Sequence, residues 1–381
     1  MDRSELTLLS VVVLFNVAIF ALWYTVPLIF SSILNYNYAL VSLLLVIIPI
    51  VEIIGCVPIG FYVDNGLAKG IGAVGTMLLV FTPVVFVIFS GIGLISMIPL
   101  GIGSIATEIS LGAYVFNVVK KVKIKYIGLV YGLSGIAGLA GAAVGGFLFE
   151  YYNTYYLLAF ISGLFLIALA IFMKYIKPIS AVHIEKSRGI KAILKEEFSL
   201  YERFKHFITG LSIFSFIFGF FEWAVWLLVP FIIVIRSANV FYGGIIYGVI
   251  CLPFGFGGLL ASRLYKRTEK RQIIIYSTLI AIGAMLFTSL ILNISAYILV
   301  LLLITSFAIS VAYLALDGYI LEKDRRDTAE FYVFETISYD TGGIFGILIS
   351  GFTVALTSIA TVSVIFFALS VAFFNILYPY Q

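Results

Sequence analysis

The sequence predicts an all-α integral membrane protein, with twelve transmembrane helices arranged in two pseudo-symmetric bundles of six. Three observations support this fold class. Of 381 residues, 62% are hydrophobic and only 11% are charged, whereas soluble domains carry about 25% charged residues. The apolar runs reach the length of about 20 residues that crosses a bilayer. Finally, a short motif from the first half of the chain recurs in the second half, which indicates an internal repeat.

Hydropathy divides the chain into twelve apolar spans, and the mean hydropathy of the whole chain is +1.17. We expect the spans at residues 6–34, 37–62, 70–90, 92–119, 126–150, 153–173, 206–235, 239–263, 272–292, 295–320, 329–352 and 355–378. The first run is longer than the apolar core of an export signal, and no small-residue cleavage site follows it. We therefore expect it to be retained as the first span.

The distribution of Lys and Arg predicts the orientation in the membrane. If the N-terminus is cytoplasmic, Arg236 is the only one of the 23 Lys and Arg residues that lies in an outer loop. Cytoplasmic loops carry the excess of Lys and Arg, and the opposite orientation would invert this distribution. We expect a multi-pass protein of the cell membrane, embedded in the lipid bilayer, with both termini in the cytoplasm.

The longest polar segment divides the chain nearly in half. We expect an N-terminal bundle at 1–173, a cytoplasmic linker at 174–205 and a C-terminal bundle at 206–381. Part of the linker places apolar residues at helical spacing between Lys and Glu: Ile193, Leu194, Phe198, Tyr201 and Phe204. This pattern is typical of an amphipathic helix on the membrane surface. A mobile linker with one apolar face is the alternative.

The two halves match at two short elements. Cys-x-Pro-x-Gly-Phe occurs at residues 56–61 and again at 251–256, and a Trp and a Pro four residues apart occur at 23–27 and at 226–230. Internal repetition of this kind is a mark of secondary transporter folds. The two cysteines occupy equivalent positions near the reducing side, so we expect small buried thiols and no disulfide between them.

The stretch GFYVDNGLAK, at the inner end of the second span, resembles the loop between spans two and three of the major facilitator superfamily. Gly60, Asp64 and Lys69 match that pattern, while Asn65 and Leu67 depart from it. The span count, the central linker and the charge distribution extend the resemblance to the whole chain. It implies two bundles that rock about a central cavity, and a gating loop that helps to close one face. A solvated loop whose acid caps a helix is the alternative.

The fifth predicted span is rich in glycine. Its Gly-Ala-x-x-Gly-Gly segment at 141–146 resembles the Gly-Pro-x-x-Gly-Gly element of exporters in the superfamily, with Ala142 in place of Pro. Close packing of helices explains the same glycines without a functional role.

Four carboxylates lie near the predicted middle of the membrane: Glu52, Glu108, Glu222 and Asp340. At a rise of 1.5 Å per residue, each is about 18 Å or more from a membrane surface. Acids embedded in a membrane are costly, and by default they mark proton, ion or substrate pathways. Burial favours a protonated carboxyl, whereas an approaching cation favours its ionised form. We expect these four residues to couple protons or cations to transport. Hydrogen bonding of neutral acids between helices is the alternative.

The sequence places no Lys or Arg at the depth of these acids, which argues against anionic substrates. We expect four aromatic residues to line the substrate cavity: Trp23, Tyr24, Trp223 and Trp226. Aromatic faces beside a carboxylate suit hydrophobic cations, although such residues are also common in membrane spans as packing. The first expectation is proton-coupled antiport with efflux of hydrophobic or cationic compounds. The alternatives are proton-coupled uptake of a neutral solute such as a sugar, and a transport-like sensor or channel.

Other function classes find no support in the sequence. Residues 70–75 fit G-x-G-x-x-G, but they open a predicted transmembrane helix and do not follow a strand, as a dinucleotide site requires. The chain has no P-loop, and its two histidines form no metal-binding spacing with cysteine. We therefore expect no enzymatic activity, cofactor, metal or nucleic acid. The expected partners of a monomer are a small-molecule substrate, protons and lipid.

Overall fold

The computed structural model describes residues 3–35, 37–88, 93–119, 125–178, 205–235, 239–264, 270–290, 296–323 and 328–353. These residues are almost entirely helical, and none of them forms a strand. The elements are α1 (Arg3–Ile33), α2 (Tyr38–Leu45), α3 (Ile47–Tyr62), η1 (Val63–Leu67), α4 (Ala68–Ile88), α5 (Gly93–Val119), α6 (Lys125–Tyr151), α7 (Thr154–Tyr175), α9 (Lys205–Ile235), α10 (Val240–Leu264), α11 (Lys270–Leu290), α12 (Ala296–Lys323) and α13 (Thr328–Thr353).

Helices form at the first eleven predicted spans, with ends that agree within a few residues. The second span is divided at Val46 into α2 and α3. The twelfth span at 355–378 and the amphipathic part of the linker lie outside the described residues. In the described chain, six helical segments are long and apolar enough to cross a membrane: Glu5–Ile33, Tyr38–Ile88, Ile95–Val115, Gly128–Tyr151, Thr154–Tyr175 and Ile208–Phe231.

Three asparagines cap the first turns of α2, α7 and α10. These three helices begin on the face of the protein where α1 ends. Asn37 Oδ1 accepts the Leu40 N–H at 3.2 Å, and Asn153 Oδ1 accepts the Tyr156 N–H at 3.1 Å. Asn239 Oδ1 accepts the N–H groups of the second and third residues of α10. Side-chain oxygens satisfy the unpaired amides of a first helical turn in this way. We call this face the opposite face, and the one on which α1 begins the N-terminal face.

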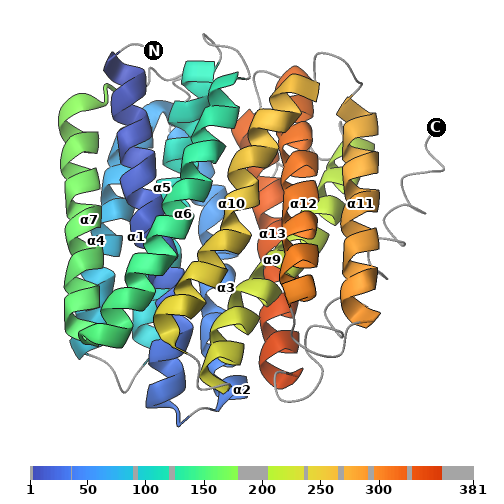
Figure 1. Ribbon diagram of the computed structural model, residues 1–381. Coiled ribbons are helices and arrows are strands. Elements are labelled where there is room, and N and C mark those ends of the chain that lie inside the picture. Colours follow the sequence, from blue (N-terminus) through green and yellow to red (C-terminus); the bar gives the residue numbers. More distant parts are fainter. Residues whose placement is uncertain are drawn as a thin grey trace.

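The helices of the two halves form two groups that lie side by side (Figure 1). In the first half, α1 packs against α6 and α7, and α4 packs against α5 and α7. In the second half, α13 packs against α9, and α12 packs against α10 and α11. This arrangement agrees with two bundles, and the chain passes from one to the other between Tyr175 and Lys205.

Two long seams join the halves: α6 runs along α10, and α2 with α3 runs along α13. Glycine makes the first seam tight. A Cβ added to Gly248 of α10 would lie 2.6 Å from Leu139 Cα of α6, and one added to Gly146 of α6 would lie 2.8 Å from the carbonyl oxygen of Val240. Small residues let membrane helices approach in this way. The glycines that resemble an exporter element thus have a packing role.

This seam gives a stability prediction with a matched control. We expect Gly248→Ala to lower the free energy of unfolding by about 1–3 kcal/mol, because the new methyl group overpacks the seam. Gly163 of α7 has open space where a Cβ would be placed. There Gly163→Ala should be neutral or raise stability by up to about 1 kcal/mol, since alanine favours the helix. Thermal unfolding in detergent would measure both, and equal shifts in the two variants would contradict the packing account.

Candidate functional site

The four carboxylates predicted at mid-membrane depth come together from four helices. They are Glu52 of α3, Glu108 of α5, Glu222 of α9 and Asp340 of α13, and we call them the acidic cluster. The side chains of Glu52 and Asp340 hydrogen-bond to each other. Glu108 is an electrostatic neighbour of each of the other three. Two members come from each half, so the cluster lies between the halves.

Two hydroxyl groups hold parts of the cluster in place. Ser104 Oγ donates to Glu108 Oε1 at 2.9 Å, one helical turn away on α5, and it also interacts with the Glu52 carboxyl group. Tyr339 Oη donates to Glu222 Oε2 at 2.8 Å, which links α13 to α9 inside the second half. Hydrogen bonds to an acid's oxygens fix its orientation and stabilise its ionised form.

The members of the cluster differ in exposure. Glu52, Glu222 and Asp340 are buried, whereas the side chain of Glu108 is exposed. The neighbours of Glu108 lie on α3, α9 and α13, so its exposed carboxyl group is turned toward the interior between the halves. α1 contacts α9 across the halves, but α5 and α12 make no comparable contact within the described ranges. We call the side of α5 and α12 the more open side of the interior, and Glu108 lies on α5.

The described helices provide no basic side chain to balance these acids. Their Lys and Arg residues lie at helix ends: Arg3, Lys69, Lys125, Lys174, Lys205, Arg263, Lys270, Arg271 and Lys323. Among the residues that the structure describes, no group of three His, Cys, Asp or Glu side chains could hold a metal ion. The acidic cluster is thus a concentration of potential negative charge that protons or a cationic solute could balance.

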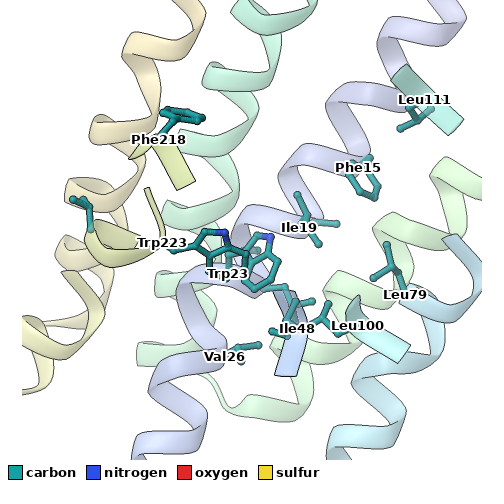
Figure 2. Packing of buried hydrophobic residues seen from close by; sticks show 14 of the residues in the cluster. Phe15, Ile19, Trp23, Val26, Ile48, Leu79, Leu100, Leu111, Phe218 and Trp223 are labelled. Atoms are coloured by element: carbon teal, nitrogen blue, oxygen red, sulfur yellow. The ribbon is translucent and has the colours of Figure 1, made fainter. Parts of the chain in front are cut away.

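The aromatic residues predicted to line a cavity pack against one another. The rings of Trp23 and Trp223 meet at right angles between α1 and α9, with centroids 4.8 Å apart (Figure 2). The ring centroid of Trp226 lies 6.4 Å from that of Trp23 and 6.1 Å from that of Trp223. Trp23, Tyr24 and Trp223 are buried, and Trp226 is half-buried. These three tryptophans form a layer, here called the tryptophan layer, that joins the halves beside the acidic cluster.

Polar contacts join the halves at the opposite face. Tyr24 Oη of α1 donates to the Val240 carbonyl at 2.6 Å. Glu150, at the end of α6, accepts the Val240 N–H at 3.0 Å and the Asn239 side-chain amide at 3.2 Å. A carboxylate at the start of α10 also interacts favourably with the positive end of that helix. With the tryptophan layer, these bonds hold the halves together between the acidic cluster and the opposite face.

The three residues of the predicted gating loop have different surroundings. A Cβ on Gly60 would lie 2.9 Å from Val333 Cγ2, so glycine lets α3 approach α13 of the other half. Lys69 Nζ instead donates to the Met173 carbonyl at 2.8 Å, near the end of α7 in its own half. Asp64 lies exposed in η1. The left-handed backbone of the loop falls on Gly66, with φ of 86°.

Several residues that position the site were not predicted from the sequence: Ser104, Glu150, Asn239 and Tyr339. Ser104 could have been found, because it precedes Glu108 by one helical turn and such residues face each other. Tyr339 precedes Asp340 directly, but the sequence gives no sign that it reaches Glu222. Nor does it indicate that Glu150 crosses to the other half.

The bond from Tyr339 to Glu222 can be tested against a neighbouring tyrosine. Tyr339→Phe removes a hydrogen bond to an acid, and we expect a loss of about 1–3 kcal/mol in unfolding free energy. Tyr247 Oη is buried without a hydrogen-bond partner among the described residues. Tyr247→Phe should therefore be neutral or stabilising. In thermal unfolding, Tyr339→Phe should therefore be the less stable of the two variants. If Tyr247→Phe were the less stable, Tyr339 would not hold Glu222.

Comparisons with known proteins identify the family. The chain matches solved structures over its whole length, although at low sequence identity. A structure of a mutant of the nucleoside transporter NupG aligns with a TM-score of 0.76 at 14% identity and covers 100% of both chains. The human organic anion transporter MFSD10 gives 0.74 at 14% identity, covering 99% of this chain and 100% of that one. The E. coli fucose:proton symporter FucP gives 0.69 at 15% identity, covering 99% and 98%.

These likenesses show the fold. A search of curated protein sequences found no match. The sequence profile of the Major Facilitator Superfamily matches residues 6–334, which is most of the chain and includes segments of both halves. The chain is therefore a multi-pass membrane transporter and not an enzyme, and it belongs to the Major Facilitator Superfamily.

Proposed function

We propose that this transporter is proton-coupled and that the acidic cluster takes up and releases the coupled protons. One observation carries the proposal: carboxylates from both halves meet at the depth predicted for the middle of the membrane, and the described helices supply no Lys or Arg there to balance them. Carboxylates that share a site in a low dielectric repel one another, and binding of a proton relieves the repulsion. Movement of the halves can thereby depend on protonation.

Within this proposal the four acids have different access to water. Glu108 is exposed and faces the more open side, so it can exchange protons with water and meet the solute. Its neighbours in the cluster are buried: Glu52, Glu222 and Asp340. Ser104 contacts both Glu108 and Glu52, which places a hydroxyl group between an exposed and a buried acid. A proton can pass along such a chain of oxygens as the halves rearrange.

The charge of the site favours a cationic organic solute. When the carboxylates release protons, an organic cation can balance their negative charge. Exchange of protons for the cation therefore keeps the interior near neutral. This makes antiport the favoured mode, with export of hydrophobic cations driven by proton entry. The ring faces of the tryptophan layer already contact one another. In this conformation the layer is better suited to closing the site than to stacking on a solute.

A neutral hydroxyl-bearing solute is the second candidate, and the uncharged polar groups of the site support it. Ser104 and Tyr339 donate hydrogen bonds to acids of the cluster. Tyr247 Oη is buried near Glu222 and has no hydrogen-bond partner among the described residues. These groups can hydrogen-bond to hydroxyls. The structures of similar fold include a nucleoside transporter and a fucose:proton symporter. Their low identity carries no argument about the substrate.

The test uses purified protein in liposomes with a trapped pH-sensitive dye. We expect gradients of hydrophobic amines to drive proton movement in the opposite direction, and we expect Glu108→Gln and Glu222→Gln to abolish it. Glu150→Gln is the matched control, because Glu150 lies outside the cluster and Gln keeps an oxygen for the Val240 N–H. This control should keep the coupling even if its rate changes.

Two results would change the proposal. Proton movement with sugars or nucleosides, and none with amines, would replace the cationic substrate by the neutral one. Solute transport that moves no protons would contradict proton coupling altogether. If the Gln variants keep full coupling, the cluster has a structural role only.

A further inference from the structure

We propose that Glu52 and Asp340 share one proton that holds α3 of the first half against α13 of the second, and that loss of this proton opens the seam. The inference rests on the proposed proton coupling, and it supplies the step by which protonation acts on the position of the halves. The bond between the two acids crosses from one half to the other.

The chemistry of the pair requires a proton. Glu52 and Asp340 are 6% and 2% exposed, and their side chains hydrogen-bond to each other. An ionised carboxylate only accepts hydrogen bonds, so two of them cannot bond without a proton on one. Asp340 Oδ2 is buried, and no donor among the described residues reaches it. The pair itself can supply the missing donor if it holds a proton.

Most of the titratable groups around the pair are also acids, so none of them can neutralise the pair once its proton is lost. Glu108 of α5 and Glu222 of α9 bring further carboxyls, and Tyr339 already donates to Glu222. Glu335 of α13 is a further buried acid on the same helix, and Ser104 donates to Glu108. Cys56, Tyr62 and Asp64 are the remaining titratable groups on α3 and η1. When the proton leaves through exposed Glu108 to water, two buried carboxylates are left facing each other, and they repel.

The surrounding packing shows which helices of the second half move together. An added Cβ at Gly219 of α9 would clash with the Tyr339 carbonyl, and one at Gly342 of α13 with the Phe216 carbonyl. α9 and α13 are therefore held together backbone to backbone. The bond from Tyr339 to Glu222 lies within this rigid pair and persists when the halves move. The bond from Glu52 to Asp340 is the one that breaks.

The protein carries its own reporter of the seam. Cys56 lies on α3 one turn beyond Glu52, and it is fully buried against Val333 of α13 and Ile105 of α5. Separation of α3 from α13 would expose its thiol. The other cysteine, Cys251, lies on α10 away from this seam, and Cys251→Ser leaves Cys56 as the only thiol.

The experiment measures alkylation of Cys56 by N-ethylmaleimide in full-length Cys251→Ser protein in liposomes, in acidic and in alkaline buffer. Each rate is divided by that of the denatured protein at the same pH, which removes the intrinsic pH dependence of the thiol. We expect the normalised rate to rise with pH, by at most about tenfold per pH unit for one released proton.

Amide variants provide the matched controls. In Glu52→Gln and in Asp340→Asn an amide donates to the remaining carboxylate without titrating, so both should label slowly at every pH. Glu52→Ala removes the bond and should label fast at every pH. Wild-type labelling that does not change with pH, or amide variants that titrate as the wild type does, would overturn the proposal.

The same samples separate this inference from the proposed function. Flat labelling in protein that still couples protons to solute movement would reject the shared proton and leave proton coupling intact. Labelling that depends on pH in protein that moves solute without protons would keep the shared proton and reject the coupling.

Discussion

The structure depends on one constraint: carboxyl groups from both halves lie in the membrane interior with no described Lys or Arg beside them. Glu52 and Asp340 are buried and bonded to each other across the halves, and exposed Glu108 lies next to both. Such a group of acids is stable only if protons or cations reduce its charge. In the proposed mechanism, its protonation, its access to water and the separation of the halves are therefore linked.

The packing around the acids divides the protein into parts that stay together and parts that can separate. Glycines let α9 contact α13 and let α6 contact α10 almost backbone to backbone. The contact of α9 with α13 lies within the second half, whereas the contact of α6 with α10 joins the two halves. At the opposite face, Tyr24, Glu150 and the tryptophan layer add bonds across the same boundary. On the side of Glu108 the helices α5 and α12 have no comparable contact in the described residues. The described conformation is thus closed toward one face and more open beside the exposed acid.

Much of this fold could be predicted from the sequence because membrane helices are long and apolar. The spans agree with the helices within a few residues, and the depth of Glu52, Glu108, Glu222 and Asp340 follows from counting along each span. Neighbours on other helices could not be predicted in the same way. These helices are apolar on nearly all sides, so periodicity does not show which side faces which partner. Nothing in the order of residues indicates that Tyr339 reaches Glu222 or that Lys69 bonds to Met173. The aromatic residues were predicted as a cavity lining, and the structure packs three of them into one layer; whether they also contact a solute remains a prediction.

The most direct measurement of the central claim is proton release on binding, made on purified protein in weakly buffered detergent with a pH indicator. If the acidic cluster exchanges protons for a cationic solute, saturating amounts of a bound amine should release protons, and Glu108→Gln should reduce the number released. A bound amine that releases no proton, in protein shown by thermal stabilisation to bind it, would contradict the account.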